Sequence, residues 1–418
     1  MNPPLQVASR TDSAADRSSD TLLIALVSLA HMVSHFSQLL LAPMFPWLRE
    51  AFQASYTELG FLMTVYFVVS CIAQALSGFW VDRWGPRPVL FLGLALICVS
   101  ALGYAASPNY AVLAVCAALA GVGNGVFHPV DYTLINRKVA PQRIGHAYSA
   151  HGICGSLGWA IAPAMLVPVA LAVSWRAAFV AAAALCALVL IVLWVQRHRL
   201  LLPTVPSAAL PGEAAAEAPL DFLRIPAVWM CFGFFFLYAV TLSVVQSFAP
   251  ESVRQLHGVA PAALALCVTL YMGGAIGGVL VGGFLAADAQ RCERVVGIGF
   301  GLAACVALVL GFATLPATTV PFLFALMGFF AGMAGPSRDL LVKKSTPAHA
   351  TGRVYGVVYA GLDIGQALTP LVFGLLMDGG HYRGLWLALV LAQAALIGSA
   401  FRVRHARKTV VTEPLARA

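Results

Sequence analysis

Ionisable side chains interrupt several long apolar stretches of this chain. His31 and His35 are four positions apart, so on a helix they share one face. His128 and Asp131 are three positions apart and share a face in the same way. Imidazole binds and releases protons near neutral pH, and ionisable groups inside a membrane usually face a protein interior or a water-filled cavity. We expect these side chains to line a path for protons or a polar solute. The structural alternative is that they only hydrogen-bond neighbouring helices.

Asp363 is a second candidate for proton chemistry. It lies about 15 Å along its apolar run at 1.5 Å per residue, near the middle of a membrane. A carboxyl at that depth suits a proton carrier, or it is a buried, hydrogen-bonded acid. We expect proton coupling at Asp363 or His35. The adjacent Arg338 and Asp339 form either part of a structural ion network or an anion site. Weaker pathway candidates are His151, Tyr238 and Gln246.

The composition requires lipid around the elements that position these groups. Of 418 residues, 60% are hydrophobic and 10% are charged, whereas soluble proteins carry roughly 25% charged residues. A spanning helix needs about 20 apolar residues, and the chain offers twelve such runs. We therefore predict an all-α membrane protein with twelve transmembrane helices. The runs are 22–47, 57–81, 88–107, 110–136, 146–172, 176–196, 226–250, 261–287, 294–314, 318–342, 354–377 and 383–402.

The runs divide into two six-helix bundles. Residues 197–225 form the long polar interruption and contain Pro203, Pro206 and Pro211, which is typical of a linker. The predicted segments are a cytoplasmic N-terminal tail (1–21), an N-terminal bundle (22–196), a cytoplasmic linker (197–225), a C-terminal bundle (226–402) and a cytoplasmic C-terminal tail (403–418).

Lys and Arg set the orientation. Most of them fall on the side that carries both termini, whereas Arg49, Arg176, Arg254 and Arg383 fall on the other side. Because cytoplasmic loops are enriched in these residues, both termini are predicted to be cytoplasmic. The net charge of +8 is spread over loops, so we expect no nucleic-acid partner. Nine cysteines include no C-x-x-C pair and act as small apolar residues, so we expect neither a metal site nor a cofactor.

The two halves repeat each other at one fixed offset. Ala42-Pro43 recurs as Ala249-Pro250, and Gly121 recurs as Gly328. Weak symmetry between six-helix halves is typical of secondary transporters, whose binding sites lie between the halves. The repeat also relates Asp131 to Arg338, so these two residues are expected to meet across the central axis as a cytoplasmic gate.

The loop after the second run resembles the signature of the major facilitator superfamily. It reads Gly-Phe-Trp-Val-Asp-Arg-Trp-Gly-Pro-Arg over residues 78–87, with Pro86 where the family usually has a basic residue. The resemblance covers about residues 22–402. It implies that Asp82 has a conformational role and contacts the start of the eleventh helix, near Thr351-Gly352. The motif residues are Gly78, Asp82, Arg83, Gly85 and Arg87.

Two further stretches resemble branches of this superfamily. The fifth run is similar to the helix-5 motif of drug:proton antiporters, although small residues at this spacing also serve plain helix packing. His35-Phe36 and the stretch 123–129 are similar to fosmidomycin-resistance-like efflux proteins. The residues of the helix-5 motif are Gly152, Gly155, Gly158 and Pro163.

The expected function is secondary active transport of a small solute by alternating access, as proton-coupled efflux of a drug or metabolite. The alternative is proton-coupled uptake of an organic anion, which Arg338 would favour; a remote alternative is a non-transporting membrane sensor. No P-loop or H-E-x-x-H motif is present, so direct ATP coupling and an enzyme are not expected. We expect a monomer in the bacterial inner membrane, whose partners are the solute, protons and lipid.

Overall fold

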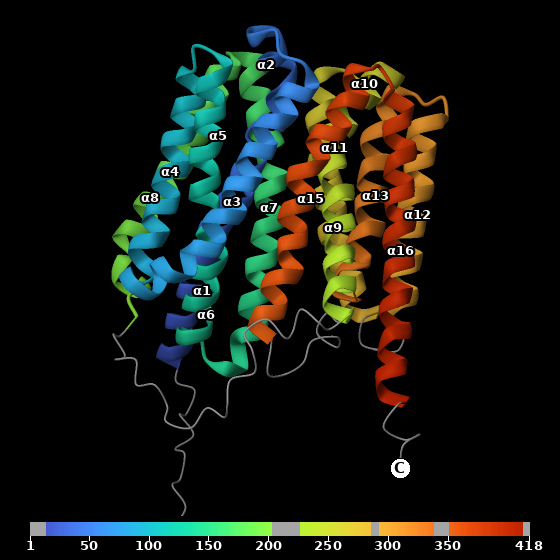
Figure 1. Cartoon of the computed structure of the whole chain (residues 1–418). Coiled ribbons are helices and arrows are strands. Elements are labelled where there is room, and N and C mark those ends of the chain that lie inside the picture. The colour runs from blue at the N-terminus through green and yellow to red at the C-terminus, as the bar shows by residue number, and fades with distance from the viewer. Residues whose placement is uncertain (1–13, 203–225, 286–291, 338–350, 413–418) are drawn as a thin grey trace, which may run out of the picture.

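The computed structural model describes residues 14–202, 226–285, 292–337 and 351–412. Every regular element in these ranges is a helix. Twelve helical segments are long and apolar enough to cross a membrane, which confirms the predicted number of spans. Two groups of helices stand side by side, α1–α8 and α9–α16, with α2 and α10 at the end opposite the start of α1 and the end of α16 (Figure 1). We call that end the distal side.

The first group holds eight helices. They are α1 (Ala14–Gln38), α2 (Phe45–Phe52), α3 (Tyr56–Trp84), α4 (Pro86–Ala106), α5 (Tyr110–Gly125), α6 (Phe127–Lys138), α7 (Ile144–Ala172) and α8 (Trp175–Val195). The second group holds α9 (Pro226–Ser247), α10 (Ala249–His257), α11 (Pro261–Leu285), α12 (Cys292–Phe312), α13 (Val320–Met333), α15 (Thr351–Asp378) and α16 (Tyr382–Thr412).

The helix ends differ from the apolar runs at both termini. Helix α1 begins at Ala14, inside the predicted tail, and α16 continues past residue 402 to Thr412. Both extensions carry charged residues, Asp16, Arg17 and Asp20 in the first and Arg404, Arg407 and Lys408 in the second, which a helix can hold in water outside the lipid. The apolar runs mark where lipid must cover the chain, and a helix can continue beyond that boundary.

Four predicted runs are broken, one of them at Ala334 after α13. Pro43 opens the short turn after α1, and Pro250 lies in the first turn of α10. Proline fits the first turn of a helix because the N–H that it lacks has no partner there. The fourth span breaks at Val126 between α5 and α6. The breaks at Pro43 and Pro250 occupy equivalent places in the repeat, as the sequence symmetry predicts.

The two halves meet along α3 and α15. On the distal side, the Asp378 carboxylate accepts the backbone N–H groups of Tyr56 (2.7 Å) and Thr57 (2.9 Å). Deeper in, the Thr64 hydroxyl donates to the carbonyl of Ala367 at 2.6 Å. The halves are therefore closed against each other from the distal side inward along this pair.

Within the second half, α11 and α13 are in backbone contact. A Cβ on Gly278 would overlap the carbonyl oxygen of Phe329, and one on Gly328 would overlap that of Tyr271. Small residues allow this approach, which replaces side-chain packing by direct backbone contact. The pair forms a tightly packed unit of the second half.

Candidate functional site

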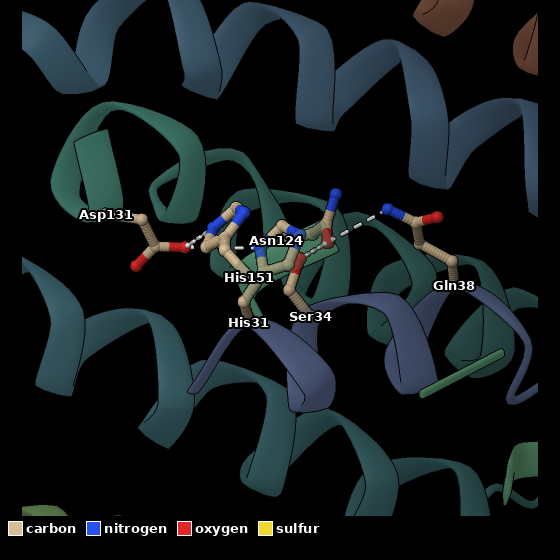
Figure 2. Close-up of polar contacts among 6 residues, drawn as sticks. All are labelled: His31, Ser34, Gln38, Asn124, Asp131 and His151. Carbon is tan, nitrogen blue, oxygen red and sulfur yellow. Dashed lines mark hydrogen bonds and ion pairs between the residues drawn. The ribbon is translucent and has the colours of Figure 1, made fainter. Parts of the chain in front are cut away.

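Five polar residues that are distant in sequence converge inside the first half. We call them the histidine cluster: His31 and His35 on α1, His128 and Asp131 on α6, and His151 on α7. Asp131 Oδ2 lies 3.0 Å from Nε2 of His151 and 3.2 Å from Nδ1 of His31. Figure 2 shows Asp131 reaching the two imidazoles. Asp131 is fully buried, so these imidazoles replace water around its carboxylate.

The rings of the cluster stack on one another. His31 lies against His151 with 3.5 Å between ring centroids, and 4.4 Å from His35. His128 is 5.1 Å from His31 and stacks on Tyr132 at 5.9 Å. His128 is only partly buried and Tyr132 is exposed, so the cluster is reached from this edge.

Two glycines of the helix-5 motif make room for the cluster. A Cβ on Gly155 would lie 2.7 Å from Nδ1 of His35 and 3.1 Å from Cδ2 of His31. A Cβ on Gly158 would overlap the carbonyl oxygen of Met32, so α7 lies directly against α1. Gly152 has open space where a Cβ would lie, and Pro163 is buried inside α7. The described contacts of Gly155 and Gly158 thus serve helix packing around the imidazoles.

A row of hydrogen-bonded amide and hydroxyl groups extends from the cluster, and we call it the amide chain. The Ser34 hydroxyl donates to Asn124 Oδ1 at 2.6 Å, and Asn124 Nδ2 donates to the Ser70 hydroxyl at 2.8 Å. Trp159 Nε1 donates to Gln38 Oε1 at 2.9 Å. In Figure 2, Ser34, Asn124 and Gln38 follow one another in space on the side of His31 away from Asp131.

None of the amide-chain residues was among the site residues predicted from the sequence. A signal was available, since Ser34 and Gln38 follow His31 at helical spacing on the same face of α1. Asn124 lies next to the end of α5, where the fourth span breaks and its polar amide is enclosed by the first half. Ser70 and Trp159 carried no pattern of their own.

Asp363 lies elsewhere, at the boundary between the halves. Gln74 Nε2 of α3 donates to Asp363 Oδ2 of α15 at 3.3 Å. The carboxyl therefore joins the two halves below the Thr64–Ala367 contact. The structure does not bring it into the histidine cluster.

Comparison with known proteins decides the family. A model of the Major Facilitator Superfamily matches residues 27–257 and 232–417. The chain belongs to the Major Facilitator Superfamily. It is 23% identical over 384 residues to the fosmidomycin resistance protein of Escherichia coli, covering 90% of this chain and 91% of that protein. It is also 23% identical over 384 residues to the hexuronate transporter of Bacillus subtilis, covering 87% and 90%.

Solved structures with a similar fold are also transporters. A crystal structure of a bacterial homolog to the human lysosomal transporter Spinster, inward-facing and occupied, superposes with a TM-score of 0.75 at 14% identity. The match covers 94% of this chain and 98% of that one. The chain described here is therefore a multi-pass membrane protein that performs secondary transport, and it is not an enzyme.

The superfamily motif lies at the end of α3. Gly85 has a φ of 81° and joins α3 to α4, which is the tight turn that the motif predicts. Asp82 and Arg83 are exposed in the last turn of α3, Gly78 has open space beside it, and Arg87 lies in the first turn of α4. The side chains around Thr351-Gly352 lie outside those described, so the expected contact of Asp82 stays a prediction.

The remaining candidates lie in the second half of this transporter. Tyr238 of α9 packs edge-on against Phe300 at 6.2 Å, and Gln246 of α9 is buried. Arg338 and Asp339 lie outside the described residues. The expected gate between Asp131 and Arg338 therefore stays a prediction, while the structure pairs Asp131 with two histidines of its own half.

Proposed function

We propose that this facilitator couples solute transport to protons through Asp363 and exports its solute from the cytoplasm. The contact between Asp363 of α15 and Gln74 of α3 carries the proposal. An ionised carboxylate accepts the amide N–H strongly, whereas a protonated one has lost its charge and holds the amide less tightly. Since the two residues belong to different halves, protonation changes the free energy of an inter-half contact.

The rest of the α3–α15 boundary supports alternating access. The distal side is closed by the bonds of Asp378 to Tyr56 and Thr57 and by that of Thr64 to Ala367. A second line of contact joins Thr269 of α11 to the carbonyl of Ala160 on α7 at 3.0 Å. Opening the distal side requires all of these bonds to break, and protonation at Asp363 would lower that cost.

The amide chain supports a solute site in the first half. Gln38 and Trp159 are partly buried, and their polar groups extend away from Asp131. Amide groups and an indole suit a polar solute with an apolar body. In the second half, Tyr238 and Gln246 of α9 are at positions related to α1 by the repeat and are assigned to the same site.

The direction of transport rests on the sequence relatives. The match to a fosmidomycin resistance protein over nine tenths of both chains favours export. Uptake of an organic anion is the second candidate, because the hexuronate transporter matches over a similar length and hexuronates are carboxylates. The predicted orientation, with both termini in the cytoplasm of a bacterial cell, makes the distal side the outer one.

Flux in proteoliposomes tests both parts of the proposal. Fosmidomycin is the export probe and glucuronate is the uptake probe, each measured with an imposed pH gradient and with none. Asp363→Asn is expected to abolish accumulation driven by the gradient and to retain exchange of labelled for unlabelled solute. Glu50→Gln, which alters an exposed acid of α2, is the control and should behave as wild type. Gradient-driven accumulation by Asp363→Asn would overturn the coupling role of this residue.

A further inference from the structure

The histidine cluster has the geometry of a metal site. Three ligand atoms, His31 Nδ1, Asp131 Oδ2 and His151 Nε2, lie within 4.8 Å of one another. In a tetrahedral zinc site with bonds of about 2.0–2.1 Å, neighbouring ligand atoms are about 3.3 Å apart. Here the two nitrogens are 3.2 and 3.0 Å from the same oxygen. Only small side-chain shifts separate this arrangement from a coordinated ion.

Hydrogen bonding alone leaves the cluster incomplete. Both imidazoles approach Oδ2 of Asp131, whereas its Oδ1 is buried without a hydrogen bond among the described residues. His31 Nδ1 lies close to Oδ2 but out of line for a hydrogen bond. Two imidazoles that served only to solvate the carboxylate would be better placed on its two oxygens. Three ligand atoms within 4.8 Å of one another suit a shared cation.

We propose that His31, Asp131 and His151 bind one divalent transition-metal ion of the zinc class. Imidazole nitrogens select zinc, copper, nickel or iron over magnesium and calcium, which prefer oxygen ligands. One carboxylate and two neutral imidazoles leave a fourth position for a water molecule. The Nδ1 atom of His128 is buried beside the cluster and has no hydrogen-bond partner among the described residues, so it could accept a hydrogen bond from such a water.

Charge and access agree with this assignment. Asp131 is buried without a Lys or Arg partner in the part of the chain described, and a bound cation supplies the missing opposite charge. The ion would enter past His128 and Tyr132, where the cluster is least covered. It would join α1, α6 and α7, the three helices that enclose the cluster.

Cobalt binding to the purified protein tests the site. Full-length, untagged protein is stripped with a chelator and titrated with Co²⁺, whose visible absorption is strong in four-coordinate nitrogen and oxygen sites. We expect one Co²⁺ per chain, displaced by one Zn²⁺. His151→Gln and Asp131→Asn should each weaken binding by about 100-fold, the upper end of what loss of even an outer-shell partner costs.

His146→Gln is the matched control, because His146 is exposed one turn before His151 on the same helix. It should bind Co²⁺ as wild type does. A cluster that binds no Co²⁺ at millimolar concentration overturns the proposal. So does equal binding by wild type and His151→Gln when both show the same metal-free melting temperature. Asp363→Asn should bind Co²⁺ normally, so this result is independent of proton coupling.

Discussion

The carboxylate of Asp378, the last residue of α15, holds Thr57 at the start of α3 by two bonds. It accepts the Thr57 backbone N–H at 2.9 Å and the Thr57 hydroxyl at 2.6 Å. The same carboxylate accepts the N–H of Tyr56, while Ser55 and Glu58 form a capping box. An acid from one half thus completes the N-terminal cap of a helix in the other half.

Asp378→Asn is expected to weaken closure of the distal side. Charge-assisted hydrogen bonds contribute about 2 kcal/mol, which is roughly thirtyfold in the ratio of closed to open forms. Amide hydrogen exchange should rise both in the first turn of α3 and around Ala367 of α15. Glu58→Ala is the control, since it removes the acceptor of the capping box and frays the same turn without touching α15. Equal exchange of α15 in Asp378→Asn and wild type would show that Asp378 is a local cap.

Gly155→Ala is expected to disturb the histidine cluster. The added methyl group would meet the His35 and His31 rings at 2.7 and 3.1 Å, and overpacking of this kind costs about 1–3 kcal/mol. The melting temperature in detergent should fall. Gly152→Ala, on the same helix with open space beside it, should be neutral or slightly stabilising. The interpretation fails if the two variants melt alike.

Asn124→Ala is expected to break the amide chain. It leaves the hydroxyls of Ser34 and Ser70 buried without their present partner, at a cost of about 1–3 kcal/mol. We expect weaker solute binding and a lower melting temperature. Asn136→Ala is the control, because Asn136 bonds Tyr148 at an exposed site. A larger loss of stability in the control would contradict this role of Asn124.

Asp82→Asn is expected to slow transport with little change in solute affinity. Asp82 is exposed in the last turn of α3, far along the helix from Thr57 at its start. That position is too close to the membrane surface for a central binding site. It fits a contact that forms only when the transporter closes on the side opposite the distal side. Initial rates in proteoliposomes over a range of solute concentrations check this. A raised KM at unchanged maximal rate would assign Asp82 to binding instead.

Much of the fold was predictable because lipid imposes a simple rule on composition. The apolar runs predicted the twelve spans, and Gly85 predicted the turn after α3. Helical spacing placed His31 and His35 on one face. The meeting of Asp131 with His151 was not predictable, because it depends on how α6 and α7 rotate and approach α1. Asp363 was found by its depth, but its partner Gln74 lies 289 positions away in sequence and no local pattern links them.

The backbone contact between α11 and α13 has a consequence for mutational tolerance. Gly278 and Gly328 each lie against a backbone carbonyl oxygen, which cannot move aside as a flexible side chain can. Even alanine is therefore excluded at both positions. Gly273, one turn away, has open space beside it. In a saturation library selected for correct insertion of the protein into the membrane, Gly278 and Gly328 should therefore stay glycine. Gly273 should accept many residues. Substitutions of glycine in the second half should therefore be excluded where a carbonyl oxygen lies against the Cα, and accepted where the space beside it is open.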